Sequence, residues 1–128
     1  MSVDSFGARL ELLVSSGQVT NEARSLTTEY LSAIETEFGI ELREGEGSAL
    51  VTHLAMALTR LARNEPAIEA PPSLIDEVAG HPRELKFTRA QLHQCGDSLG
   101  CPLPESEIVF MAAHLCVLTA TMQGSQQK

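Results

Sequence analysis

Among the side chains that could do chemistry, His53 and His114 have the most informative neighbours. His53 precedes Arg60 by seven residues in the segment LVTHLAMALTRL, and His114 follows Glu107 by seven in ESEIVFMAAHLCVL. On a helix, positions seven apart differ by about 20° around the axis, so each histidine shares a face with a charged residue. An arginine so placed can bind an anion beside the half-exposed imidazole. Taken singly, a helical histidine is more often a packing residue than a functional one.

The hydrophobic spacing around these residues predicts that they lie on helices. Apolar side chains recur at three- and four-residue steps, and no segment alternates as a half-buried strand does. The expected helices cover about residues 6–14, 19–38, 48–63, 73–79, 85–99 and 104–122. The fold class is therefore expected to be all-α, a compact bundle of five to six helices. The last helix is apolar almost all round, which predicts that it is largely buried.

Glycine, proline and serine mark the ends of several expected helices. Gly39 and Gly100 close the second and the fifth, because glycine readily adopts the left-handed geometry found after a helix. Residues 43–47 are charged and rich in glycine, and are expected to form a connector. Ser73 is expected to cap the short fourth helix. Pro104 is expected to be the first residue of the last helix, where its missing N–H costs nothing.

Length and composition limit the possible functions. A chain of 128 residues is expected to form one domain with a real core, and 43% of it is hydrophobic. The formal net charge of −8 argues against direct binding of nucleic acid, because phosphate contacts need clustered Lys and Arg. Three cysteines, no signal-peptide pattern and no apolar segment long enough to span a bilayer predict a cytoplasmic protein without a membrane segment.

The residues around both histidines resemble the two histidine motifs of the PTS regulation domain, or PRD. His53-Leu54, with Ala57 and Arg60 at the following offsets, is similar to the first motif. The letters LPESEI at residues 103–108, followed by His114-Leu115, are similar to the second. Asn64-Glu65-Pro66 and His81-Pro82 stand where the family has an Asn-Pro turn and a Tyr-Pro pair. The order and spacing match over roughly residues 20–120.

This resemblance implies a PRD-like helical bundle, often dimeric, whose histidines are phosphorylated by the sugar phosphotransferase system through HPr or an enzyme IIB component. It makes His53 and His114 the acceptor candidates and Arg60 a residue that supports the phosphate. Many family members carry Asp directly before the first histidine, where this chain has Thr52. His81 replaces the usual Tyr and is assigned no role.

The resemblance also suggests how the chain is organised and how it acts. Residues 1–19 are expected to be an N-terminal helical extension, 20–122 the PRD-like domain and 123–128 a flexible tail. Most PRDs adjoin an RNA-binding or DNA-binding domain, and none is recognised in these 128 residues. We therefore expect regulation, transcriptional or metabolic, through an unknown protein partner, a homodimeric assembly, no cofactor and no enzymatic activity.

Two further interpretations stay open. The chain could be a dimeric helical interaction module in which His53 and His114 only pack. It could also bind a metal ion through a set of histidine and cysteine residues, although their spacing fits no common zinc pattern. The four candidate ligands are His81, His93, Cys95 and Cys101. An enzyme is disfavoured because the sequence has no glycine-rich phosphate loop and no nucleophile elbow.

Overall fold

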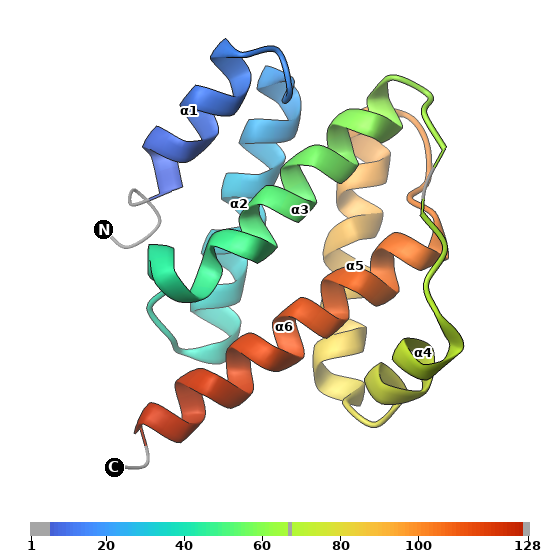
Figure 1. Ribbon diagram of the computed structural model, residues 1–128. Coiled ribbons are helices and arrows are strands. Elements are labelled where there is room, and N and C mark those ends of the chain that lie inside the picture. The colour runs from blue at the N-terminus through green and yellow to red at the C-terminus, as the bar shows by residue number, and fades with distance from the viewer. Residues whose placement is uncertain (1–5, 67, 127–128) are drawn as a thin grey trace. The chain divides into compact units, whose positions relative to one another are not determined.

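A computed structural model describes residues 6–66 and 68–126 of the chain. Six helices account for most of these residues, and no strand occurs among them, which confirms the all-α class (Figure 1). The helices are α1 (Gly7–Ser15), α2 (Asn21–Phe38), α3 (Glu44–Ala62), α4 (Pro72–Ala79), α5 (Pro82–Leu99) and α6 (Glu105–Gln126). The described chain forms two compact units, one ending at Thr59 and one beginning at Arg60, so the division falls within α3.

In the first unit, α1 packs against α2, and threonine side chains fix the start of α2. The Thr20 hydroxyl accepts a hydrogen bond from the Ala23 N–H at 3.1 Å, the usual side-chain cap of a helix N-terminus. The Thr20 N–H donates to the buried Thr59 hydroxyl at 3.2 Å, which ties the start of α2 to α3. At the other end of α2, Gly39 adopts φ 64°, as expected for a residue that closes a helix.

The expected connector at residues 43–47 is partly helical, so α3 begins at Glu44 and not at about Ser48. Gly47 lies against the buried Phe6 ring, and a Cβ at this position would be only 2.8 Å from Phe6 Cζ. Glycine at position 47 therefore reflects close packing of α3 on Phe6 and not a flexible link. Helix propensity alone argues against two glycines in a first helical turn, and tertiary packing overrides it here.

The segment between α3 and α4 contains one confirmed boundary and one wrong prediction. The third helix stops before Pro66 as expected, and Asn64 follows it in the left-handed region at φ 58°, a conformation that asparagine tolerates. The prediction that Ser73 caps the fourth helix is wrong, because Pro71 occupies the N-cap position and Pro72 begins α4. Proline suits the first helical position because it has no N–H to satisfy, so the helix starts two residues earlier.

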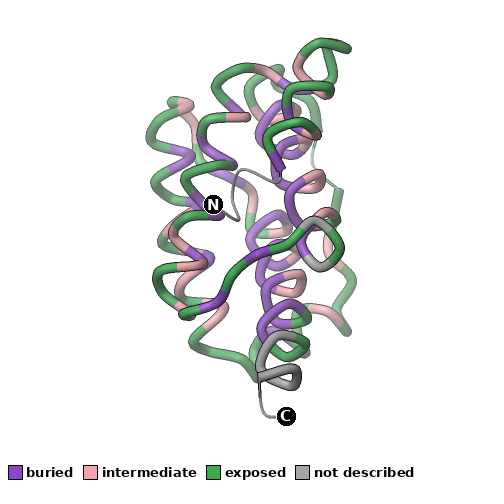
Figure 2. Tube along the Cα trace, turned by 90° about the vertical axis from the view of Figure 1, so that its left-hand side faces the viewer, coloured by how far each residue is buried: buried purple, intermediate pink, exposed green. Residues whose placement is uncertain are grey.

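In the second unit, α4 and α5 both pack against α6. Val78 of α4 and Val109 and Ala112 of α6 form a buried apolar cluster there. The prediction of a largely buried last helix is confirmed, although Val117 keeps 68% of its surface exposed. Figure 2 marks the buried residues along the chain. The buried α6 residues are Glu107, Ile108, Val109, Met111, Ala112, Leu115, Leu118 and Thr119, with Cys116 9% exposed.

The ends of α6 differ slightly from expectation. Helix α6 begins at Glu105, one residue after Pro104, whose carbonyl accepts hydrogen bonds from the N–H groups of Glu107 and Ile108. It continues through Gln126, so four residues of the expected tail are helical, and residues 127–128 lie outside the described part. Among the described residues, no helix is long and apolar enough to cross a lipid bilayer.

Candidate functional site

His53 lies on α3 in the first unit and is half-buried, as its position at the edge of the apolar stripe predicts. Its neighbour Leu54 is fully buried, which fixes the direction in which this part of α3 packs. Thr52, on the other side of His53, accepts a hydrogen bond on its hydroxyl from Arg9 Nη1 at 3.4 Å. A guanidinium group from α1 therefore lies beside the residue next to the candidate acceptor.

Arg9 was missed by the sequence analysis, which places residues 1–19 outside the PRD-like domain. It is 43 positions from Thr52, so no local spacing connects the two. The only sequence feature that could have pointed to Arg9 is its place on an expected helix, whose apolar residues Leu10, Leu12 and Leu13 predict packing against the rest of the chain. Because Thr52 stands where many family members have Asp, Arg9 meets a neutral hydroxyl at this position and not a carboxylate.

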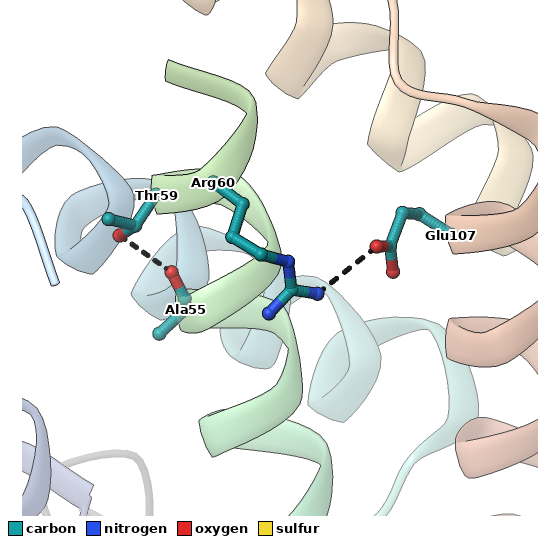
Figure 3. A network of polar contacts seen from close by, with 4 residues as sticks. All are labelled: Ala55, Thr59, Arg60 and Glu107. Atoms are coloured by element: carbon teal, nitrogen blue, oxygen red, sulfur yellow. Dashed lines mark hydrogen bonds and ion pairs between the residues drawn. The ribbon is translucent and has the colours of Figure 1, made fainter. Parts of the chain in front are cut away.

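Arg60, the expected phosphate-supporting residue, is already engaged in an ion pair. Its Nη2 lies 3.2 Å from Glu107 Oε2, which links the last turn of α3 to the first turn of α6 (Figure 3). The Glu107 side chain is 4% exposed and that of Arg60 is 26% exposed. A carboxylate buried to this extent needs a cation, because the desolvation cost of an unpaired charge is several kcal/mol.

One nitrogen of the Arg60 guanidinium takes no part in this pair. Among the described residues, its Nε is buried and meets no hydrogen-bond acceptor. A buried donor without an acceptor costs about 1–3 kcal/mol. The neighbouring Thr59 is satisfied differently, because its hydroxyl donates to the Ala55 carbonyl of the same helix at 2.9 Å (Figure 3).

His114 lies on α6 in the second unit and is also half-buried. The next residue, Leu115, is buried, and Val117, three residues after His114, is exposed. Glu107 is expected on the same helix face seven residues earlier, and in the structure the Arg60 guanidinium compensates the Glu107 charge. Repulsion of a new anion by Glu107 is therefore weaker than the sequence alone suggests.

The four-residue metal interpretation is not supported by the geometry. His81 gathers with Glu84 and Cys116 and not with His93, Cys95 or Cys101. His93 and Cys101 line one pocket at the end of α5, together with Gly96 and Gly100, whereas Cys95 is buried. The four side chains therefore do not gather at one site in the described part of the chain.

Comparison with known proteins places this arrangement in a family. No curated protein and no solved structure matches the chain. A family model described as the PRD domain matches residues 26–116, which include α3 with His53 and most of α6 with His114. The match begins after α1 and extends to Cys116, within the region of roughly 20–120 that the motifs cover. The chain therefore belongs to the PRD family, whose members are regulatory modules.

Proposed function

We propose that this protein is a non-enzymatic regulatory module of the cytoplasm that receives a phosphoryl group from the sugar phosphotransferase system. His53 is the main acceptor, His114 the second, and HPr or an enzyme IIB component the donor. The observation that carries this proposal is the setting of His53, half-exposed on α3 with the Arg9 guanidinium bonded to the residue beside it. A phosphoryl group adds nearly two negative charges and several acceptor oxygens, which an arginine stabilises through charge-assisted hydrogen bonds.

Arg60 gives the same histidine a second cation and connects phosphorylation to packing. It follows His53 by seven residues on α3, about 10.5 Å along the axis, and helical side chains lean toward the N-terminus. We propose Arg60 as the residue that supports a phosphate on His53, as the family resemblance implies. Its guanidinium already binds the buried Glu107 carboxylate, so recruitment of Arg60 by the phosphate would weaken that contact and shift the packing of α6.

His114 is a poorer acceptor on the same reasoning. It lies among buried residues of α6, and the charged group two turns away on its own helix face is Glu107. A dianion at this position gains less from its surroundings and costs more desolvation than one at His53. We therefore rank His53 first and His114 second.

The proposed output goes through a protein partner. We propose a homodimer as the active assembly, and the 68% exposed Val117, three residues after His114, is an apolar side chain that an interface would cover. Sedimentation at tens of micromolar, where a standard-sized interface should hold, is expected to report a dimer. A clean monomer at that concentration would count against the dimer.

The phosphorylation proposal is tested on the full chain with phosphoenolpyruvate, enzyme I and HPr, and separately with enzyme IIB. Intact-mass measurement at neutral pH, followed by fragmentation, should find one phosphoryl group in the peptide that contains His53. A matched reaction without enzyme I controls for direct transfer from phosphoenolpyruvate. If neither donor phosphorylates the chain, the alternative of an interaction module without phosphoryl chemistry is favoured.

A further inference from the structure

Three side chains of different chemistry meet in the second unit, away from His53 and His114. His81, Glu84 and Cys116 each offer one ligand atom, and these atoms all lie within 4.8 Å of one another. His81 is the residue just before α5, Glu84 is in the first turn of α5 and Cys116 is on α6. From the sequence, Glu84 and Cys116 have no expected role, and His81 is a candidate metal ligand only with His93, Cys95 and Cys101. Cys116 is 35 residues away from His81, so no local spacing connects the two.

The backbone holds His81 and Glu84 in a defined register. The His81 N–H donates to the Val78 carbonyl at 2.9 Å, and the His81 carbonyl accepts from the Leu85 N–H at 3.0 Å. Pro82, the first residue of α5, restricts the chain directly after His81. The ends of α4 and α5 therefore fix the position of the histidine, while its exposed ring remains free to rotate toward a ligand.

Thr119 supports the other two members of the cluster. Its hydroxyl lies 3.1 Å from Glu84 Oε2 and 3.2 Å from the Cys116 carbonyl, and donates a hydrogen bond toward these acceptors. Hydrogen bonds of this kind orient ligating carboxylates in metal sites and are part of the site. Thr119 thus positions Glu84 on the same side of α6 as Cys116.

The surroundings of the Cys116 sulfur are acidic. Burial, together with the Glu84 and Glu77 carboxylates that disfavour a second negative charge, raises the pKa of the Cys116 thiol to about 11. These carboxylates belong to α5 and α4, so the thiol on α6 is approached by negative charge from both neighbouring helices. A bound dication reverses this balance because it neutralises the carboxylates and stabilises the thiolate.

We propose that His81, Glu84 and Cys116 bind a divalent transition-metal ion of the zinc class. One nitrogen, one oxygen and one sulfur donor form a set that zinc accepts, and three protein ligands leave a fourth position for water. Metal bonds of about 2.0–2.3 Å imply ligand separations of about 3.5 Å in a tetrahedron. The three ligand atoms now lie within 4.8 Å of one another, and a small rotation of the exposed His81 ring brings its nitrogen to the shorter separation. On binding, the Cys116 thiol releases its proton to solvent as the metal–sulfur bond forms.

Such an ion would connect the start of α5 to α6 and stabilise the helix that carries His114. Binding of the ion is independent of phosphoryl transfer, because none of the three coordinating side chains is a proposed phosphate acceptor. The ion binds the folded chain, where the three ligands are together, in preference to the unfolded chain. Bound metal is therefore expected to raise the midpoint of thermal unfolding.

The site is tested on the full reduced chain by titration with Co²⁺ and then with Zn²⁺. We expect one Co²⁺ per chain, a cobalt–thiolate charge-transfer absorption band and displacement of that band by Zn²⁺. Cys116→Ala should abolish the band, and His81→Ala should weaken Co²⁺ binding at least about tenfold, as loss of a ligand does. Circular dichroism checks that each variant remains helical, and His81 is exposed, so its replacement leaves the core intact.

Two matched controls separate this site from nonspecific thiol binding. Cys101→Ala removes another cysteine with some exposure, and His93→Ala removes another exposed histidine, both outside the cluster. Each should retain the band and the one-to-one stoichiometry. The proposal is overturned if wild-type protein gives no band, if the band survives in Cys116→Ala, or if His81→Ala binds Co²⁺ as tightly as wild type.

Discussion

Two carboxylates in the first turn of α6 form ion pairs that differ in burial and in geometry. Glu107 is buried and meets Arg60 of α3 through one contact of 3.2 Å. Glu105 is 62% exposed and meets Arg89 of α5, 39% exposed, through two parallel hydrogen bonds of 2.7 and 2.8 Å. Positions two apart on a helix face different directions, so one carboxylate points into the protein and the other toward solvent.

The comparison shows that burial, more than bond length, decides how much an ion pair matters. The Arg89–Glu105 pair has the better geometry, but water competes for both groups, and exposed pairs contribute about 0.2–1 kcal/mol. The Arg60–Glu107 pair is longer, but removal of one partner leaves a charge that solvent cannot reach. Breaking such a pair costs about 3–5 kcal/mol. The family motif includes Arg60 and Glu107, and the exposed Arg89 lies outside it.

The largest effect is expected for Arg60→Ala. Because the buried Glu107 carboxylate loses its ion pair with Arg60, the free energy of unfolding should fall by about 3 kcal/mol, the lower end of the range since Arg60 is partly exposed. Urea denaturation followed by circular dichroism measures this change. A loss below about 1 kcal/mol would show that Glu107 does not depend on Arg60.

A double-mutant cycle sharpens the same comparison. Glu107→Gln removes the buried charge and keeps the shape of the side chain, so it should cost less than Arg60→Ala. Adding Glu107→Gln to Arg60→Ala should recover part of the loss, because the buried side chain at position 107 then carries no charge. The coupling energy from the cycle is expected to exceed about 1 kcal/mol, and a value near zero would contradict a direct interaction.

The exposed Arg89–Glu105 pair is the control for burial, and its loss is expected to change stability less. Arg89→Ala should lower the free energy of unfolding by less than about 1 kcal/mol. The difference between Arg89→Ala and wild type should shrink further as salt is raised into the molar range, because the Debye length falls from about 10 Å at 0.1 M to about 3 Å at 1 M and solvent reaches both groups. A loss equal to that of Arg60→Ala would refute the role of burial.

A pH dependence of small size is expected from Glu105. Its hydrogen bond to Arg89 lowers the pKa of the Glu105 carboxyl below the ordinary 4.5, and the Arg89 charge adds to this. A lowered folded-state pKa gives stability that is present above the unfolded value and lost as pH falls through the folded one. The difference in stability between wild type and Arg89→Ala should therefore be constant above about pH 5 and decline below pH 4.5. Urea denaturation of both proteins from pH 3 to 7 measures it, and a difference that grows at low pH would contradict this sign.

Much of the fold could be predicted from local patterns. Helical periodicity located all six helices, and Gly39 and Gly100 mark helix ends because their left-handed geometry is a local property of the chain. The start of α3 and the cap of α4 were misplaced where packing on Phe6 or a proline at the first helical position overrides local preference.

The candidate site was only partly predictable, because motifs report residues and not their contacts. The spacing of His53 and His114 to charged residues is local, and both histidines are half-buried as expected. The Arg60–Glu107 contact joins residues 47 apart, and Arg9 meets Thr52 across 43 residues. No helical period encodes separations of this kind, so these partners become visible only when the chain is folded.

The proposed acceptor is tested most directly by phosphoryl transfer from HPr to wild type, His53→Ala, His114→Ala, the double variant and His93→Ala. Intact mass at matched times gives the fraction phosphorylated in each. We predict that His53→Ala loses most of the incorporated phosphate, that His114→Ala loses less and that His93→Ala behaves as wild type. Incorporation at the wild-type level in the double variant of His53 and His114 would contradict the assignment of both histidines.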